Sequence, residues 1–189
     1  MSECNQSTIT DRAFAHMSTL RELTMHRCTQ TTITDRAFQH LSGLQTLNLN
    51  WCTQETLSDA LFQPLGALQN LSMVGCSQRT LTDAAFAHLS GLRFLNMAHC
   101  CQRTITAAAF TTLRRLQSLN VSGCTQPIWT AQMFQHMHQL WDLQMDTRRL
   151  DVETRSVLMA LPNLSRISKQ RLGEYMIQER TAGGRPAYA

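Results

Sequence analysis

Hydrophobic and polar residues follow two different periods inside a unit of 24 residues. In the unit that begins at Leu44, apolar Leu47 and Leu49 alternate with polar neighbours such as Asn48. This alternation predicts a short strand with one buried face. After a polar stretch, Ser58 and Asp59 predict the N-cap and the acidic first turn of a short helix. We therefore expect each unit to form one coil of strand, loop, helix and return.

The unit recurs six times without insertion, so equivalent residues form columns. One column is cysteine throughout and leaves only Cys101 outside the series: Cys4, Cys28, Cys52, Cys76, Cys100 and Cys124. Leucine, glutamine and phenylalanine columns keep the same spacing, and the phenylalanines are Phe14, Phe38, Phe62, Phe86, Phe110 and Phe134. Self-similarity at this period is typical of a solenoid, in which stacked units create a core that no single unit can form.

These columns resemble the leucine-rich repeats, specifically the cysteine-containing subclass. The resemblance covers about residues 4–167, and one unit fills the family columns with Leu44, Leu47, Leu49, Cys52, Leu57, Ser58, Asp59 and Phe62. Two additional residues between Cys52 and Leu57 imply a slightly longer crossover loop. The resemblance implies an α/β fold: a right-handed leucine-rich-repeat solenoid, shaped as a horseshoe segment, with a parallel sheet on its concave face and short helices on its convex face.

The array is predicted to occupy residues 1–167, with six units of 24 residues and a degenerate capping unit from residue 145. Residues 168–178 are expected to form one short helix through Leu172, Met176 and Ile177, and residues 181–189 a disordered tail. The first unit lacks its strand, so the N-terminal edge of the stack is uncapped. This edge suggests self-association, or a chain that is a fragment of a longer array.

Composition narrows the setting in which the chain works. No apolar run reaches the roughly 18 residues that a membrane helix needs, so no membrane partner is expected. The first residues lack the features of a signal peptide, and seven cysteines then indicate reduced thiols in a cytoplasmic protein, with the nucleus left open. A net charge of +4 with a single lysine makes nucleic acid an unlikely partner. A basic band is nevertheless expected in the middle of the array, from Arg93, Arg103, Arg114 and Arg115.

The sequence offers no catalytic constellation. It contains no phosphate-binding glycine loop, nucleophile elbow or zinc-binding helix motif, so we expect no cofactor, no metal and no enzymatic activity. The cysteine column is interpreted as a structural ladder of buried thiols that bond weakly to the loop backbone, because collinear ligands do not converge on a metal.

Partner binding is expected where the repeat is broken. The middle strand column is polar and includes Asn48, Asn96 and Asn120, and it is either a solvated strand face or a contact surface. Large or ionisable side chains interrupt the pattern at or beside it, at Trp51, Phe94, His99 and Trp141. Aromatic residues beside amides are typical of binding hot spots, so this concave face is predicted to bind another protein.

The sequence therefore favours two functions. The first is a non-catalytic protein-protein interaction module; similarity to the repeat portion of F-box proteins implies substrate recognition for a ubiquitin ligase, with another chain supplying the ligase-docking domain. The second is a structural protein of homotypic assembly, or part of a longer array, motivated by the uncapped N-terminal edge.

Overall fold

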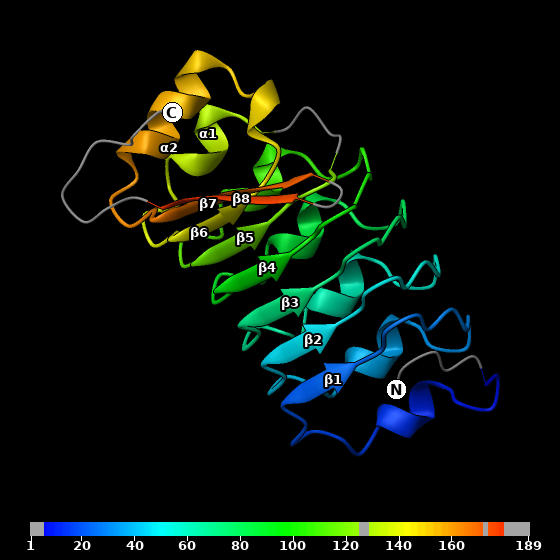
Figure 1. The fold of residues 1–189 in the computed structure, drawn as a ribbon. Helices are drawn as coiled ribbons and strands as arrows, with labels where there is room; N and C mark the ends of the chain where they lie inside the picture. The colour runs from blue at the N-terminus through cyan, green and yellow to red at the C-terminus, as the bar shows by residue number, and fades with distance from the viewer. Residues whose placement is uncertain (1–5, 125–128, 172–173, 180–189) are drawn as a thin grey trace.

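The computed structural model describes residues 6–124, 129–171 and 174–179 as one repeating coil (Figure 1). Its single sheet follows chain order from β1 to β8, with β1 to β7 parallel and β8 antiparallel to β7. The strands are β1 (Glu22–Thr24), β2 (Thr46–Asn48), β3 (Asn70–Ser72), β4 (Phe94–Asn96), β5 (Ser118–Asn120), β6 (Asp142–Gln144), β7 (Arg166–Arg171) and β8 (Glu174–Glu179). This arrangement confirms the predicted leucine-rich-repeat solenoid.

Short helices form a second layer across the core from the strands (Figure 1). Most are single 3₁₀ turns of four residues, and α2 is the only longer helix among the described residues. They are η1 (Asp11–Phe14), η2 (Asp35–Phe38), η3 (Asp59–Phe62), η4 (Asp83–Phe86), η5 (Ala107–Phe110), α1 (Ala131–Phe134), η6 (Thr147–Arg149) and α2 (Val152–Ala160). None of the described helices is long and apolar enough to cross a membrane.

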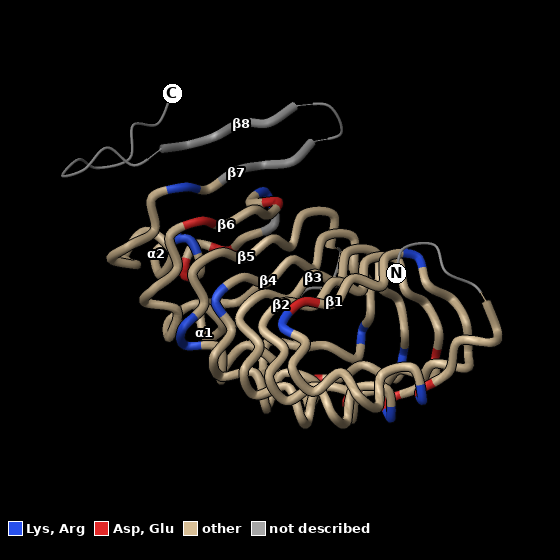
Figure 2. The backbone as a smooth tube through the Cα atoms, turned by 90° about the horizontal axis from the view of Figure 1, so that it is seen from below, with Lys and Arg blue, Asp and Glu red and all other residues tan. Residues whose placement is uncertain are grey.

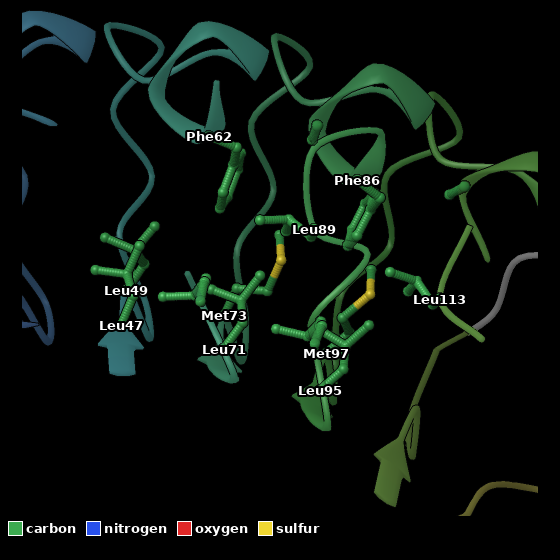
Figure 3. Close-up of a cluster of buried hydrophobic side chains, with 14 of the residues drawn as sticks. Leu47, Leu49, Phe62, Leu71, Met73, Phe86, Leu89, Leu95, Met97 and Leu113 are labelled. Atoms are coloured by element: carbon green, nitrogen blue, oxygen red, sulfur yellow. The ribbon is translucent and has the colours of Figure 1, made fainter. Parts of the chain in front are cut away.

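The core consists of columns that run through the stack. Leu47, Leu71 and Leu95 are partners in neighbouring strands and point into the space between the two layers (Figure 3). The helix phenylalanines meet them from the other side, and Phe86 stacks on Phe110 with ring centroids 6.0 Å apart. Full burial of each such side chain stabilises the fold by about 1.5–3 kcal/mol, so the stack itself is the main source of stability.

The aspartate at the start of each 3₁₀ turn connects neighbouring units. Asp35 accepts hydrogen bonds from the backbone N–H of Ser58 at 2.8 Å and from its hydroxyl at 2.6 Å. Asp59 repeats this pair of bonds on Thr82, at 2.8 and 2.6 Å. The hydroxyls of Ser58 and Thr82 also cap their own turns, as predicted, by accepting from the N–H two residues later. The aspartates therefore act between units as well as at the helix N-termini.

This ladder of aspartate bonds stops at the fifth unit. Asp83 still bridges to Thr106, but Ala107 occupies the next aspartate position. Thr130, the residue that an aspartate at 107 would reach, makes no side-chain cap hydrogen bond. The junction before α1 therefore lacks a connection that four preceding junctions possess.

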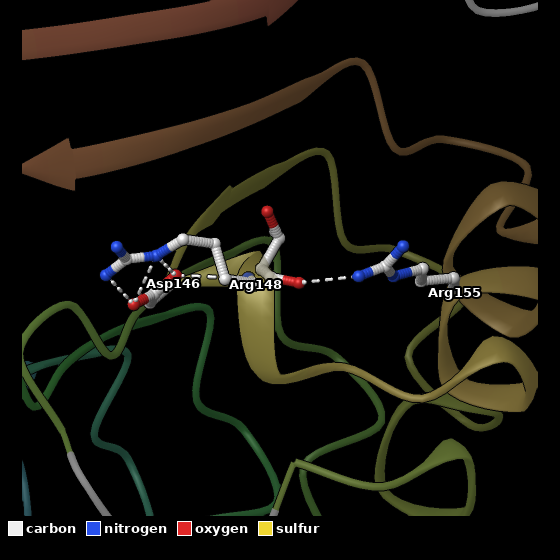
Figure 4. Close-up of polar contacts among 4 residues, drawn as sticks. Asp146, Arg148 and Arg155 are labelled. Carbon is white, nitrogen blue, oxygen red and sulfur yellow. Dashed lines mark hydrogen bonds and ion pairs between the residues drawn. The ribbon is translucent and has the colours of Figure 1, made fainter.

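The C-terminal unit departs from the repeat and closes the array. Asp146 pairs with Arg148 at 2.6 Å, and Arg155 donates to the carbonyl of Thr147 at 3.4 Å, which ties η6 to α2 (Figure 4). Asp151 caps α2 by accepting from the Thr154 N–H at 2.7 Å. These local bonds replace the cysteine and aspartate columns that this unit has lost.

The short helix expected over 168–178 is wrong. Residues 168–171 continue β7, which pairs in parallel with β6, and β8 pairs with β7 so that Lys169 lies opposite Met176. An open sheet edge favours strand pairing, and Tyr175, Met176 and Ile177 include strand-favouring side chains. Leu172 and the predicted tail at 181–189 lie outside the described residues.

We predict that Ala107→Asp raises the unfolding free energy by about 1 kcal/mol, because its carboxylate would accept from the N–H and hydroxyl of Thr130. Asp59→Ala, which removes both bonds from Thr82, should lower the unfolding free energy by about 1–3 kcal/mol. Urea denaturation measures both changes.

Thr130→Val in the Ala107→Asp background is the matched control and should erase most of the gain. An Ala107→Asp protein no more stable than the wild type would show that the aspartate bonds contribute nothing to the stack.

Candidate functional site

The candidate site is the exposed face of the sheet. In β2, β3 and β5 the central leucine is buried and its two neighbours are half-buried, so alternate side chains leave the core. The register aligns the last residue of each strand across the sheet, giving a row of Asn48, Ser72, Asn96, Asn120 and Gln144. This confirms that the predicted polar column is continuous.

Three asparagines of this row share one conformation. The Oδ1 atom of Asn48 accepts from the N–H of Asn50 at 2.9 Å, that of Asn96 from Ala98 at 3.1 Å, and that of Asn120 from Ser122 at 3.0 Å. Each amide oxygen is therefore held by the chain two residues later, and none of the three Nδ2 groups donates to another described residue. We call Asn48, Asn96 and Asn120 the asparagine column; it presents hydrogen-bond donors to solvent.

Two other residues on this face also accept hydrogen bonds from within the chain. Asn50 accepts from the Ser72 hydroxyl at 2.7 Å and from the Val74 N–H at 2.8 Å. Thr46 accepts from the Asn70 amide at 3.2 Å. Ser72 therefore differs from the asparagine column, because its hydroxyl already donates a hydrogen bond to Asn50.

After each of the strands β1 to β5, the residue that lies three positions beyond the last strand residue adopts a left-handed backbone. The φ angles are 53° at Arg27, 60° at Trp51, 66° at Gly75, 59° at His99 and 73° at Gly123. Side chains other than glycine adopt this region at a cost of about 1 kcal/mol or more. Inter-unit hydrogen bonds hold the conformation, since the N–H of Trp51 donates to Val74 at 2.7 Å and that of His99 to Ser122 at 2.8 Å.

Two of these residues place a ring against the glycine of the next unit. A Cβ atom on Gly75 would collide with the indole carbons of Trp51, and one on Gly123 would collide with the imidazole of His99. Trp51 nevertheless remains 43% exposed, and His99 is exposed. We call Trp51 and His99 the ring ledge: one side of each ring lies on backbone and the rest faces solvent.

The structure does not gather all the predicted aromatic residues. Phe94 is the first residue of β4 and is 40% exposed, on the same face as Asn96. Trp141 is also 40% exposed, but it precedes β6 at the amino end of the strands, whereas the ring ledge follows their carboxyl ends. Trp141 therefore lies apart from the ring ledge.

The sequence indicated Trp51 and His99 as candidates but not how they are held. The available signal was the glycine in the same column of the following unit, at Gly75 and at Gly123. Its meaning depends on a contact between units, which a single unit does not reveal.

The basic residues do not form one band. Arg93, Arg114 and Arg115 are exposed before β4 and β5, whereas Arg103 lies in the loop after β4. Charged positions lie mostly along the edges and the helix side of the coil, with few on the described strands β1 to β6 (Figure 2). The predicted basic band is therefore divided between the amino ends and the carboxyl ends of the strands.

The described cysteines form a structural ladder. Each thiol donates to a carbonyl at the strand end of the preceding unit: Cys52 to Met25 at 2.7 Å, Cys76 to Leu49 at 3.1 Å, Cys100 to Met73 at 2.9 Å and Cys124 to Met97 at 3.0 Å. Each acceptor belongs to the residue that directly follows a strand, so the thiols bond to the loop backbone as expected. Cys28 is also buried, Cys101 is exposed, and Cys4 lies outside the described residues.

Burial makes these thiols poor nucleophiles and poor metal ligands. Loss of hydration raises the pKa of Cys52, Cys76, Cys100 and Cys124 from 9.0 to about 12. Within the described residues, no group of three or more histidine, cysteine or acidic side chains is placed to hold a metal ion.

Comparison with known protein families identifies the type of repeat. The model of the BspA type leucine rich repeat region matches residues 5–145 in six copies. The match is to this type, and the predicted cysteine-containing subclass and F-box similarity are not confirmed. A search of curated proteins found no match.

Solved structures share the fold. The chain aligns with TLR13 in its crystal structure with ssRNA13 at a TM-score of 0.63 and 24% identity, over 83% of this chain and 23% of that one. It aligns with a chain of the Toll–Spatzle complex of Drosophila at a TM-score of 0.64 and 14% identity. This alignment covers 84% of the present chain and 21% of the other chain. The chain thus spans under a quarter of either. Because the first of these structures contains RNA, the comparisons do not support the expectation that nucleic acid is an unlikely partner.

We predict that Cys101 reacts with a thiol reagent at pH 8 far faster than Cys52, Cys76 and Cys100, because it is exposed and their thiols are buried and protonated. Mass spectrometry of briefly labelled native protein measures this by position. A urea-unfolded sample, in which all should react alike, is the control. Equal labelling in the native protein would contradict the thiol ladder.

We also predict that the unfolding free energy falls as pH rises from about 9 towards 12. The unfolded thiols lose their protons near 9.0, while the folded thiols keep theirs to about 12, so high pH favours the unfolded chain. Cys76→Val/Cys100→Val should show a shallower fall in urea melts at pH 8 to 11. Parallel curves for the two proteins would contradict this.

Proposed function

The chain belongs to the BspA type leucine-rich repeat family, and from this premise we propose that it is a non-catalytic module that binds a protein partner on its exposed strand face. We define the recognition face as the asparagine column, the ring ledge and Phe94. Trp141 is left outside it because it lies at the other end of the strands.

One observation supports the proposal: on this face, hydrogen-bond donors without partners among the described residues lie beside exposed rings that are held in place. The three asparagines keep their amide oxygens on the backbone and leave their Nδ2 groups available. Trp51 and His99 are fixed by the left-handed turn and by the glycine below each ring. Fixed rings and oriented donors lose little conformational entropy when a partner binds, which favours a binding surface over a merely solvated one.

The similar arrays add support from their own complexes. One is the Toll–Spatzle complex and the other is TLR13 with ssRNA13. The aspartate bonds and the cysteine thiol bonds take no part in this proposed function, because both connect neighbouring units.

Two finer parts of the proposal come from the sequence. We expect the protein to act inside the cell, in the cytoplasm or nucleus. We also propose substrate recognition for a ubiquitin ligase, and co-purification with ligase subunits would support this role.

Homotypic assembly is the second candidate function. The observation that favours it is that β1 is the terminal strand and pairs, among the described residues, with β2 alone. At the other end, β8 covers the last parallel strand. A second copy pairing with β1 would cover the open edge.

We predict that Asn96→Asp/Asn120→Asp weakens partner binding at least tenfold for each substitution. Aspartate keeps the oxygen that accepts the backbone N–H but lacks the two amide donors, so the fold is retained while the partner loses its contacts. The partner is first captured from lysate with wild-type protein, and affinities are then measured by calorimetry.

Gln39→Glu/Gln63→Glu is the matched control, because it adds the same charge at exposed positions on the helix side. It should bind as the wild type does. Light scattering over a concentration series separates the alternative. A concentration-dependent oligomer with no variant-sensitive protein partner would overturn the proposal in favour of assembly, and captured RNA would overturn the protein partner.

A further inference from the structure

We propose that the partner segment bound by the recognition face is a proline-rich chain in the polyproline II conformation, with prolines three residues apart. This inference rests on the proposed function and names the chemistry of its partner. Three features of the face lead to it: the kind of polar group that it presents, the fixed rings, and the distance between those rings.

The asparagine column favours a ligand that offers hydrogen-bond acceptors. The asparagine column offers Nδ2 donors, while its oxygens accept from Asn50, Ala98 and Ser122. A polyproline II segment is the complement of this surface, since its carbonyls make no internal hydrogen bonds and its prolines have no N–H to satisfy.

The ring ledge supplies flat apolar platforms. Trp51 and His99 each cover the glycine of the next unit, so the rings cannot sink towards the backbone and their outer sides stay open. Aromatic surfaces of this kind receive the proline rings of polyproline II ligands, whose rigid backbone loses little entropy on binding.

The spacing of the platforms matches the period of the ligand. The inter-unit hydrogen bonds continue through this column, where the N–H of Trp51 donates to Val74, that of Gly75 to Ala98 and that of His99 to Ser122. Neighbouring units are therefore separated by the usual strand spacing, and two units by about 9.6 Å. Three residues of polyproline II rise about 9.3 Å. Prolines at positions i and i+3 would each meet one ring, and Asn48 and Asn96 lie three residues before those rings in the sequence.

The test uses the full chain and neutral synthetic peptides as probes. One peptide repeats Pro-Ala-Ala four times, and two others place the prolines every second or every fourth residue. Fluorescence anisotropy of the labelled peptides should give binding for the three-residue period and at least tenfold weaker binding for the other two. Equal affinities for all three peptides would overturn the proposal.

Variants locate the binding. Trp51→Ala removes a platform, and Gly75→Ala displaces the indole without removing it, so each should weaken binding of the three-residue peptide at least tenfold. Trp141→Ala is the matched control, an equally exposed tryptophan outside the recognition face, and should bind as the wild type does. Thermal melting verifies that each variant is folded. Wild-type affinity in folded Trp51→Ala would overturn the proposal.

The outcome separates this inference from the proposed function. A captured protein that depends on Asn96 and Asn120, but is not displaced by the three-residue peptide, would leave the proposed function standing and overturn the proline inference. Displacement of that protein by the peptide would support both. If neither the peptide nor any protein requires the recognition face, both are wrong.

Discussion

Every part of this structure depends on the fact that a unit of 24 residues cannot satisfy itself. One coil buries neither its leucines nor its phenylalanine, and both become buried only when the next coil covers them. The polar groups obey the same constraint. The carboxylate of Asp59 finds its donors on Thr82, and the thiol of Cys76 finds its acceptor on Leu49. The repeat is therefore stable as a stack of interfaces.

The same constraint shapes the face that we assign to binding. Trp51 holds an unusual backbone conformation because its N–H bonds to Val74, and its ring keeps its position because the next unit has glycine at 75. Stacking thus positions a surface residue as well as the core. The asparagine column arises in a similar way, since each side chain closes the end of its own strand and leaves its amide nitrogen exposed. Recognition and stability are supplied by neighbouring columns of one repeat.

Much of the fold could be predicted because each column appears six times in the sequence. The strand at Leu47, the N-cap at Ser58 and the buried phenylalanines follow from local periodicity, and all are present. Contacts between units were beyond local reasoning: the aspartate bonds, the carbonyl acceptors of the thiols and the glycine below Trp51. The C-terminal hairpin was missed because pairing at a sheet edge outweighed the helical spacing of Met176 and Ile177. The side chains of Gln30 and Gln54 are buried without hydrogen-bond partners among the described residues, and nothing in the structure accounts for them.

The central claim is that the partner binds across the asparagine column and the ring ledge. Nuclear magnetic resonance of the ¹⁵N-labelled protein tests it directly, by following the side-chain amide signals of Asn48, Asn96 and Asn120 and the indole signal of Trp51 as the captured partner is added. The account predicts that these four signals shift together and that their hydrogens become protected from exchange. Shifts confined to β1 or to the helix side, with these signals unchanged, would contradict it.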